Sequence, residues 1–100
     1  MSKFGMIGKF ITHEGERDAL AQILLEAANI LQSVEGCELY VVSVSDNEPE
    51  SVGVTEVWSD SAAHQASLTI EEVRALIQRG RPMIASVEGT KLRTLGGKGL

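Results

Sequence analysis

The apolar residues of this chain recur with two different periods, and the order of those periods restricts the fold more than any other feature. Four runs alternate apolar and polar residues, as β-strands do: 4–12, 37–45, 52–59 and 83–88. The helical spacing of three and four residues follows the first run and again follows the third run. A single domain over residues 1–100 with the order β-α-β-β-α-β is therefore predicted.

The longest helical pattern covers residues 17–34, where apolar side chains share one face of the predicted helix. These residues are Leu20, Ile23, Leu24, Ala27, Leu31 and Val34. Gly36 is placed to end this helix, because glycine is favoured just beyond helix C-termini.

The second helical region begins where the third strand-like run ends, at Trp58. Asp60 and the serines on either side of it are typical N-cap residues and predict a short helix directly afterwards. Thr69 and Glu72 have the spacing of a capping box, which predicts a further helix that Gly80 ends.

This order of elements is typical of the ferredoxin-like α+β fold, in which an antiparallel sheet carries its helices on one face. The strands nevertheless carry apolar residues on both faces, for example Ile7 opposite Met6 and Val41 opposite Tyr40. A monomer would leave the second apolar face in water. We therefore expect the sheets of two copies to pack face to face in a twofold homodimer.

Composition excludes several kinds of partner. The net charge is −5, and the nine Lys and Arg residues are scattered, which disfavours nucleic acids and anionic membranes as partners. No apolar run approaches the ~18–20 residues that span a bilayer. Cys37 is the single cysteine, so an intrachain disulfide is impossible, and we expect a reduced thiol in a cytoplasmic protein. Residues 89–100 are polar and rich in glycine and are predicted to form a C-terminal tail.

The candidate site lies in residues 54–68. Glu56 and Trp58 share one strand face, and His64 follows on the next helix. A lone Trp on a strand is commonly a core residue, and His64 is compatible with a partly exposed helix position. A carboxylate in an apolar strand, however, needs a partner or a wet cavity. We predict a cavity between sheet and helices whose walls and polar groups are Phe4, Met6, Tyr40, Glu56, Trp58 and His64. The candidate partners for Glu56 are Arg81 and His64.

Other chemistry has weaker support in the sequence. The chain contains no CxxC, HExxH, GxSxG, GxGxxG or phosphate-binding loop. Two His and one Cys far apart in sequence are poor support for a metal site, so none is predicted. A nucleophilic pair of Cys37 with His13 or His64 is compatible with the sequence, but no pattern favours it. We expect His13 to lie in solvent in the turn after the first strand.

Several segments together resemble the antibiotic biosynthesis monooxygenase family, in the branch of the quinol monooxygenases. The segments are FGMIGKF, GERDALAQILLEAA, GC-LY-V, VTEVWSDSAAHQASL and VRALI-RGRPMIA, which cover nearly the whole chain. The E-x-W of Glu56 and Trp58, followed by a helix with His64, is the most useful marker. The resemblance implies a ferredoxin-like homodimer whose two sheets form a dimeric α/β barrel.

The resemblance also implies an activity, namely oxidation of quinol-like or polyketide aromatic molecules by O2 without flavin, haem or metal. An electron-rich phenolate can itself pass an electron to oxygen, so the protein has to bind the ring, favour the anion and exclude water. By this resemblance Trp58 would hold the ring or the oxygenated intermediate. His64 would move the proton, and Arg81 would stabilise an oxyanion.

Relatives with this fold carry out other functions, and three alternatives stay open. Haem-degrading members pair a Trp and a His with an Asn on the first strand, and residues 4–12 contain no Asn. Other relatives isomerise phosphorylated sugars. A third possibility is a non-enzymatic stress protein or small-molecule-binding protein, because a fold alone does not decide function.

Overall fold

The structure is a computed structural model that describes residues 2–100. It contains four strands and three helices in the predicted β-α-β-β-α-β order, with the second helical region divided in two. The elements are β1 (Lys3–Thr12), α1 (Arg17–Leu31), β2 (Cys37–Ser43), β3 (Ser51–Trp58), α2 (Ser61–Ser67), α3 (Glu71–Gly80), the 3₁₀ turn η1 (Arg81–Met83) and β4 (Ile84–Thr94).

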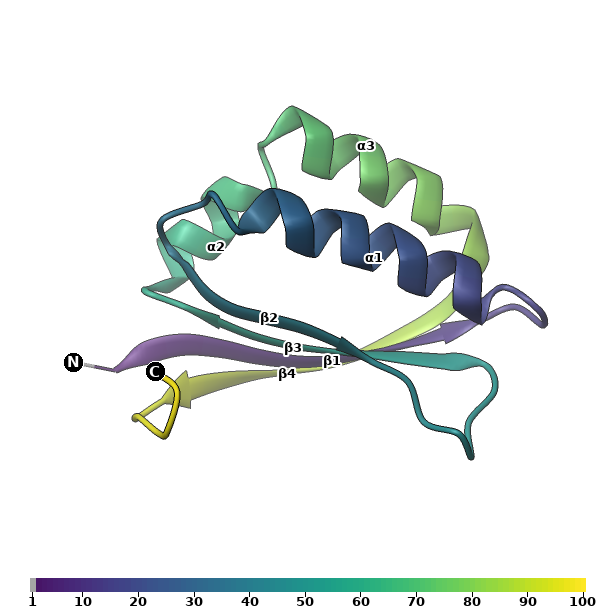
Figure 1. Ribbon diagram of the computed structural model, residues 1–100, viewed down its shortest axis with the longest axis horizontal. Helices are drawn as coiled ribbons and strands as arrows, with labels where there is room; N and C mark the ends of the chain where they lie inside the picture. Colours follow the sequence, from purple (N-terminus) through teal and green to yellow (C-terminus); the bar gives the residue numbers. More distant parts are fainter. Residues whose placement is uncertain (1) are drawn as a thin grey trace.

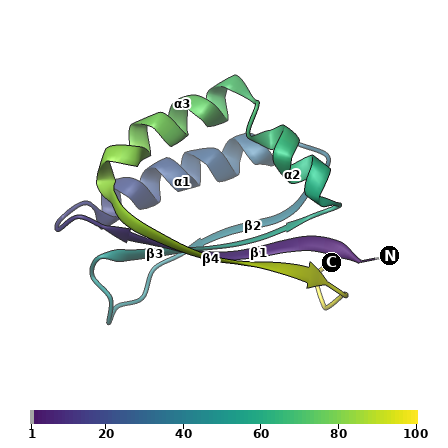
Figure 2. The ribbon, with the colours of Figure 1, turned by 180° about the vertical axis from the view of Figure 1, so that it is seen from behind.

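The strands form one sheet in the order β2-β3-β1-β4, and every neighbouring pair is antiparallel. All three helices lie on the same face of this sheet, and the opposite face carries no covering element of residues 2–100 (Figure 1, Figure 2). The ferredoxin-like α+β prediction is therefore confirmed. Within residues 2–100, no helix combines the length and apolar composition needed to cross a membrane.

The strand register decides which residues face the helices. Trp58 of β3 pairs with Phe4 of β1, and Glu56 pairs with both Met6 of β1 and Tyr40 of β2. Because directly paired residues point to the same side of a sheet, these five side chains belong to the helix-facing side. The next residue along each strand points to the uncovered side.

The core lies between this side of the sheet and the helices. One buried cluster joins Ile23 and Ala27 of α1 to Leu76 of α3, and a second joins Leu31 and Val73 to Trp58, which is 1% exposed. These α1 residues are the ones whose helical spacing predicted an apolar face. Gly80 lets α3 approach α1 closely, since a Cβ there would lie 3.1 Å from Leu20 Cδ1.

The structure corrects the predicted end of α1 and the role of Gly36. The helix ends at Leu31 rather than at Val34, and Gly36 lies in the following turn rather than at the helix terminus. A Cβ at Gly36 would lie only 2.6 Å from Ala63 Cβ on α2. The Gly36 carbonyl also accepts a 2.9 Å hydrogen bond from the Ser59 N–H, so this turn packs directly against the start of α2.

The helix caps were predicted with mixed success. Asp60 caps α2 as expected, because its carboxylate accepts a 2.7 Å hydrogen bond from the Ala63 N–H. The prediction that Thr69 and Glu72 form a capping box is wrong. Helix α3 begins with Ile70 as its N-cap residue, while the Thr69 hydroxyl donates to the Ala66 carbonyl at the end of α2. The short connection between the two helices leaves Thr69 at the end of the first rather than the start of the second.

The prediction of a C-terminal tail over residues 89–100 is wrong for residues 89–94. Strand β4 continues to Thr94 and pairs with β1 as far as Lys3, so residues 89–94 belong to the sheet. The mostly polar composition of this segment suits an exposed edge strand, which has no neighbour on its outer side. The two strands lie close together at Gly5 of β1, where a Cβ would lie 2.4 Å from Thr94 Oγ1 and 3.4 Å from Leu92 Cβ.

We predict that Gly36→Ala destabilises the fold by about 1–3 kcal/mol, because the new methyl group collides with Ala63 and neither group can rotate away. Removing the opposing methyl group with Ala63→Gly should relieve this collision. The double variant should therefore lose less free energy of unfolding, measured in urea, than the sum of the two single variants.

Gly53→Ala is the matched control, since its Cβ would meet its nearest atom at an ordinary 3.7 Å. If the double variant lost as much free energy of unfolding as Gly36→Ala and Ala63→Gly together, the contact between residues 36 and 63 would not limit the packing of α2.

Candidate functional site

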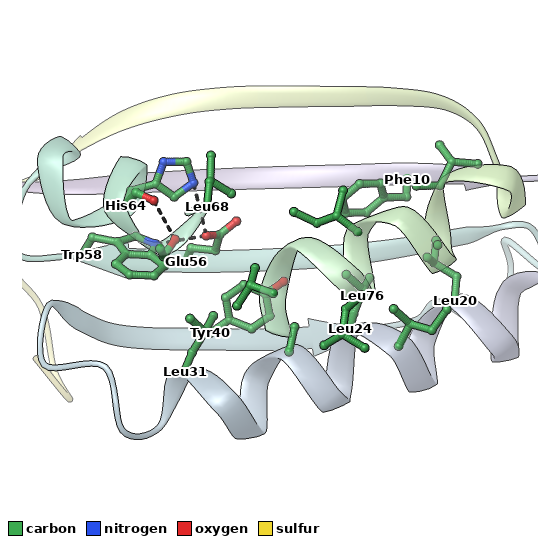
Figure 3. A pocket seen from close by; sticks show the side chains of 17 residues that line it. Phe10, Leu20, Leu24, Leu31, Tyr40, Glu56, Trp58, His64, Leu68 and Leu76 are labelled. Carbon is green, nitrogen blue, oxygen red and sulfur yellow. Dashed lines mark hydrogen bonds and ion pairs between the residues drawn. The ribbon is translucent and has the colours of Figure 1, made fainter. Parts of the chain in front are cut away.

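A cavity of about 190 Å³ lies between the helices and the sheet (Figure 3). Its lining comes from all three helices and from all four strands. At one end Glu56 and Trp58 of β3 meet His64 of α2 (Figure 3). Away from this end the lining is largely apolar and includes Phe10, Leu20, Leu24, Leu76, Ile77 and Ile84.

The polar end is organised around one carboxylate oxygen. The Trp58 indole N–H donates a 3.0 Å hydrogen bond to Glu56 Oε1. His64 Nε2 lies 3.8 Å from the same oxygen, which brings the imidazole within ion-pair distance when it is protonated. The Glu56 and His64 side chains are only 13% and 16% exposed, so water competes little for these contacts. Glu56 therefore has the partners that a carboxylate on an apolar strand requires.

Two aromatic rings hold the His64 imidazole in place. The Phe4 ring centroid lies 5.2 Å from the imidazole, and the Trp58 ring meets it edge-on at 5.5 Å. The backbone also positions His64, because β3 ends at Trp58 and α2 begins at Ser61. The Ser67 hydroxyl, inside the cavity lining, donates a 2.6 Å hydrogen bond to the His64 carbonyl.

Tyr40 places a phenol in the cavity beside this carboxylate. Burial raises the pKa of Tyr40 well above its ordinary value of about 10, and the negative charge of Glu56 raises it further. The same two causes, burial first, raise the pKa of the Cys37 thiol, which packs against the Trp58 cluster outside the cavity lining. Tyr40 is therefore a neutral hydrogen-bonding group at working pH.

The structure brings together four of the seven residues predicted for the site. Tyr40, Glu56, Trp58 and His64 line one cavity, and Phe4 contacts the His64 ring without lining it. Neither Met6 nor Arg81 belongs to the cavity lining.

Arg81 differs most from the prediction. Arg81 is exposed and is the first residue of the 3₁₀ turn η1. Of the two partners predicted for Glu56, the structure brings only His64 to the carboxylate, which also accepts the Trp58 N–H. Sequence distance gave no information about which cation would reach the carboxylate.

The structure also shows where the residues of the alternative sites lie, namely His13 and Cys37. His13 is exposed in the turn after β1, and the Cys37 thiol faces the Leu39 carbonyl at 3.8 Å. Among residues 2–100, no three His, Cys, Asp or Glu side chains are gathered as metal ligands.

Sequence reasoning missed the apolar part of the cavity. Leu20, Leu24 and Leu76 were recognised only as members of helical faces, and Phe10 only as a strand residue. Helical periodicity predicts that such residues face the sheet but not that a space remains between them.

Fold and site together place the chain among the ferredoxin-like proteins with a cavity between sheet and helices. The sequence model of the antibiotic biosynthesis monooxygenase family matches residues 4–79, which include all four cavity residues named above. The chain belongs to this family.

Known structures agree with that assignment. A Chloroflexus aurantiacus J-10-fl protein named for the same family is 40% identical, with a TM-score of 0.88 and 96% of each chain covered. A Caulobacter crescentus CB15 protein, also named for the family, is 15% identical with a TM-score of 0.87, covering 95% of this chain and 92% of its own. At this lower identity the likeness concerns the fold alone. No match is found among curated proteins.

We predict that Tyr40 titrates far above the ordinary tyrosine range, because burial and Glu56 both oppose its ionisation. Tyr40 is the single tyrosine, so the ultraviolet absorbance of tyrosinate reports it alone. A group whose pKa is raised by folding stabilises the protein below its unfolded pKa. Stability should therefore fall as pH rises above ~10.

Glu56→Gln should bring the titration of Tyr40 to lower pH without removing the whole rise in its pKa, since burial is the largest cause of that rise. The chain in denaturant provides the reference value. A folded protein that titrates at that same value would refute the burial of the Tyr40 hydroxyl.

Proposed function

We propose that this protein is a cofactor-independent monooxygenase that oxidises a quinol-like or polyketide aromatic molecule with O2. The supporting observation is the shared Glu56 oxygen, which holds an indole and an imidazole at one end of a mainly apolar cavity. Membership of the antibiotic biosynthesis monooxygenase family supports the same reaction class.

The reaction balances without a further reductant. A hydroquinone and O2 give a hydroxyquinone and water, so that one oxygen atom enters the ring and the other leaves as water. The substrate supplies all four electrons that O2 accepts. Deprotonation of a ring hydroxyl starts the sequence, because the phenolate gives up an electron to O2 far more readily than the neutral phenol.

His64 is the proposed base for that proton. Its imidazole faces the cavity, and the Glu56 carboxylate 3.8 Å from Nε2 would stabilise the imidazolium that forms. Glu56 acts as a positioning residue for both His64 and Trp58. The Trp58 ring and the apolar walls would hold the substrate ring and keep bulk water from the oxygenated intermediate. Arg81 has no role in this proposal because it lies outside the cavity lining.

We expect His64→Ala to lower the rate of oxygen uptake with a reduced naphthoquinol by about 10²–10⁴-fold, as loss of a general base does. His13→Ala is the matched control, because the other histidine is exposed in the β1–α1 turn and should leave the rate unchanged. The wild-type rate should survive a chelator.

Thermal unfolding of each variant separates loss of chemistry from loss of fold. If oxygen uptake with a set of such quinols never exceeded the rate of their autoxidation without protein, the proposed monooxygenase activity would be refuted. If the same compounds still bound, the protein would instead be a non-enzymatic binding protein.

We further propose that the protein works as a homodimer, a dimeric α/β barrel formed through the uncovered sheet face. Strand register places Ile7, Val41 and Leu92 on that face, and all three are exposed. They lie in two adjacent cross-strand rows, one containing Ile7 and Val41 and the other containing Leu92 and Val57. An uncovered sheet face that exposes several large apolar side chains is typical of an interface.

The dimer predicts that Ile7→Asp converts the protein to a monomer in light scattering, because two carboxylates would be buried about the twofold axis. Leu25→Asp is the control, since Leu25 is an equally exposed leucine on α1, away from the sheet. A wild-type mass equal to one chain at micromolar concentration would contradict the dimer.

A further inference from the structure

The cavity has unlike ends. Its polar groups are concentrated where Glu56, Trp58 and His64 meet, with the Tyr40 phenol beside them (Figure 3). The opposite end is formed by Phe10, Leu20, Leu24 and Leu76, which offer no hydrogen-bonding side chain (Figure 3). A ligand that fills both ends must itself be polar at one end and apolar at the other.

The volume limits the size of that ligand. An engineered apolar cavity of roughly 150 Å³ holds one benzene molecule. The present cavity, at about 190 Å³, suits one or two rings with a short substituent and not the fused systems of larger polyketides.

The charge of the lining limits the ligand further. No Lys or Arg lines the cavity among residues 2–100, and Glu56 is the one acidic residue there. An anionic substituent would have to leave water without meeting a Lys or Arg, and at the polar end it would compete with the Glu56 carboxylate for His64. The cavity therefore disfavours phosphates and carboxylates as ligands, including phosphorylated sugars.

The solvent-exposed part of the cavity lining has the same apolar character. Of the lining residues, only Leu68 at the end of α2 and Ile77 on α3 are exposed, by 45% and 39%. They are the points at which the lining reaches solvent, and large apolar side chains at such points favour apolar ligands.

We propose that the substrate is an uncharged one- or two-ring phenol with a short alkyl arm, whose hydroxyl lies at the Glu56–His64 end and whose arm lies among Phe10, Leu24 and Leu76. As a statement about the substrate, this rests on the proposed function. The binding preference itself is measured without any oxidation.

Calorimetric titration of para-alkylphenols, from para-methylphenol to para-butylphenol, tests the apolar end. Affinity should rise about fourfold for each added methylene until the end is filled, from the ~0.8 kcal/mol that burial of one methylene contributes. The matched anion, para-hydroxyphenylbutanoate, should bind at least about tenfold more weakly than para-butylphenol. In the proposed pose its carboxylate would be buried among Phe10, Leu24 and Leu76, which offer it no hydrogen-bonding side chain.

Leu24→Phe places a bulkier side chain in the apolar end and should abolish the gain from the longer arms while leaving para-methylphenol bound. Leu25→Phe is the control, because this neighbouring leucine is exposed and lies outside the cavity. Urea denaturation confirms that both variants fold.

Equal affinities along the alkyl series, or tighter binding of the carboxylate, would overturn this inference. The two proposals can fail separately. Oxygen uptake with a flat alkyl series would overturn only the preference for an alkyl arm, whereas the predicted series without oxygen uptake would overturn only the monooxygenase.

Discussion

The site depends on a carboxylate that the fold places on the buried side of its sheet. Glu56 shares the helix-facing side with Trp58, and the apolar faces of α1 and α3 must pack over both. A carboxylate there is tolerated because Oε1 accepts the Trp58 N–H and lies close to His64. The cavity lies between the helices and this side of the sheet, with Glu56 at its polar end.

The same side chains serve packing and the proposed chemistry. Trp58 is almost fully buried in a core cluster and also forms a wall of the cavity. Trp58 is therefore a core residue that also lines the cavity, and its role toward a substrate stays a prediction. Substitutions at Trp58 will change stability and ligand binding together, which is why His64 and the alkyl series are the cleaner tests.

Much of the fold could be predicted because it depends on local pattern. The alternation of the strands placed Phe4, Tyr40, Glu56 and Trp58 on the helix-facing side, and Asp60 marked the start of α2. The errors concern glycines and chain segments whose roles depend on distant neighbours. Gly36 looked like a helix terminator but is required by Ala63, and residues 89–94 looked like a tail but pair with β1.

The sequence by itself determined the order of the elements and the side of the sheet on which each strand residue lies, because both follow from the period of apolar residues. Only the tertiary structure decided which side chains meet. It joined Tyr40 and Glu56 to His64, left Arg81 outside, and opened an apolar end toward Leu24. The reason is that periodicity specifies direction, whereas distances between elements depend on how individual side chains pack between the layers.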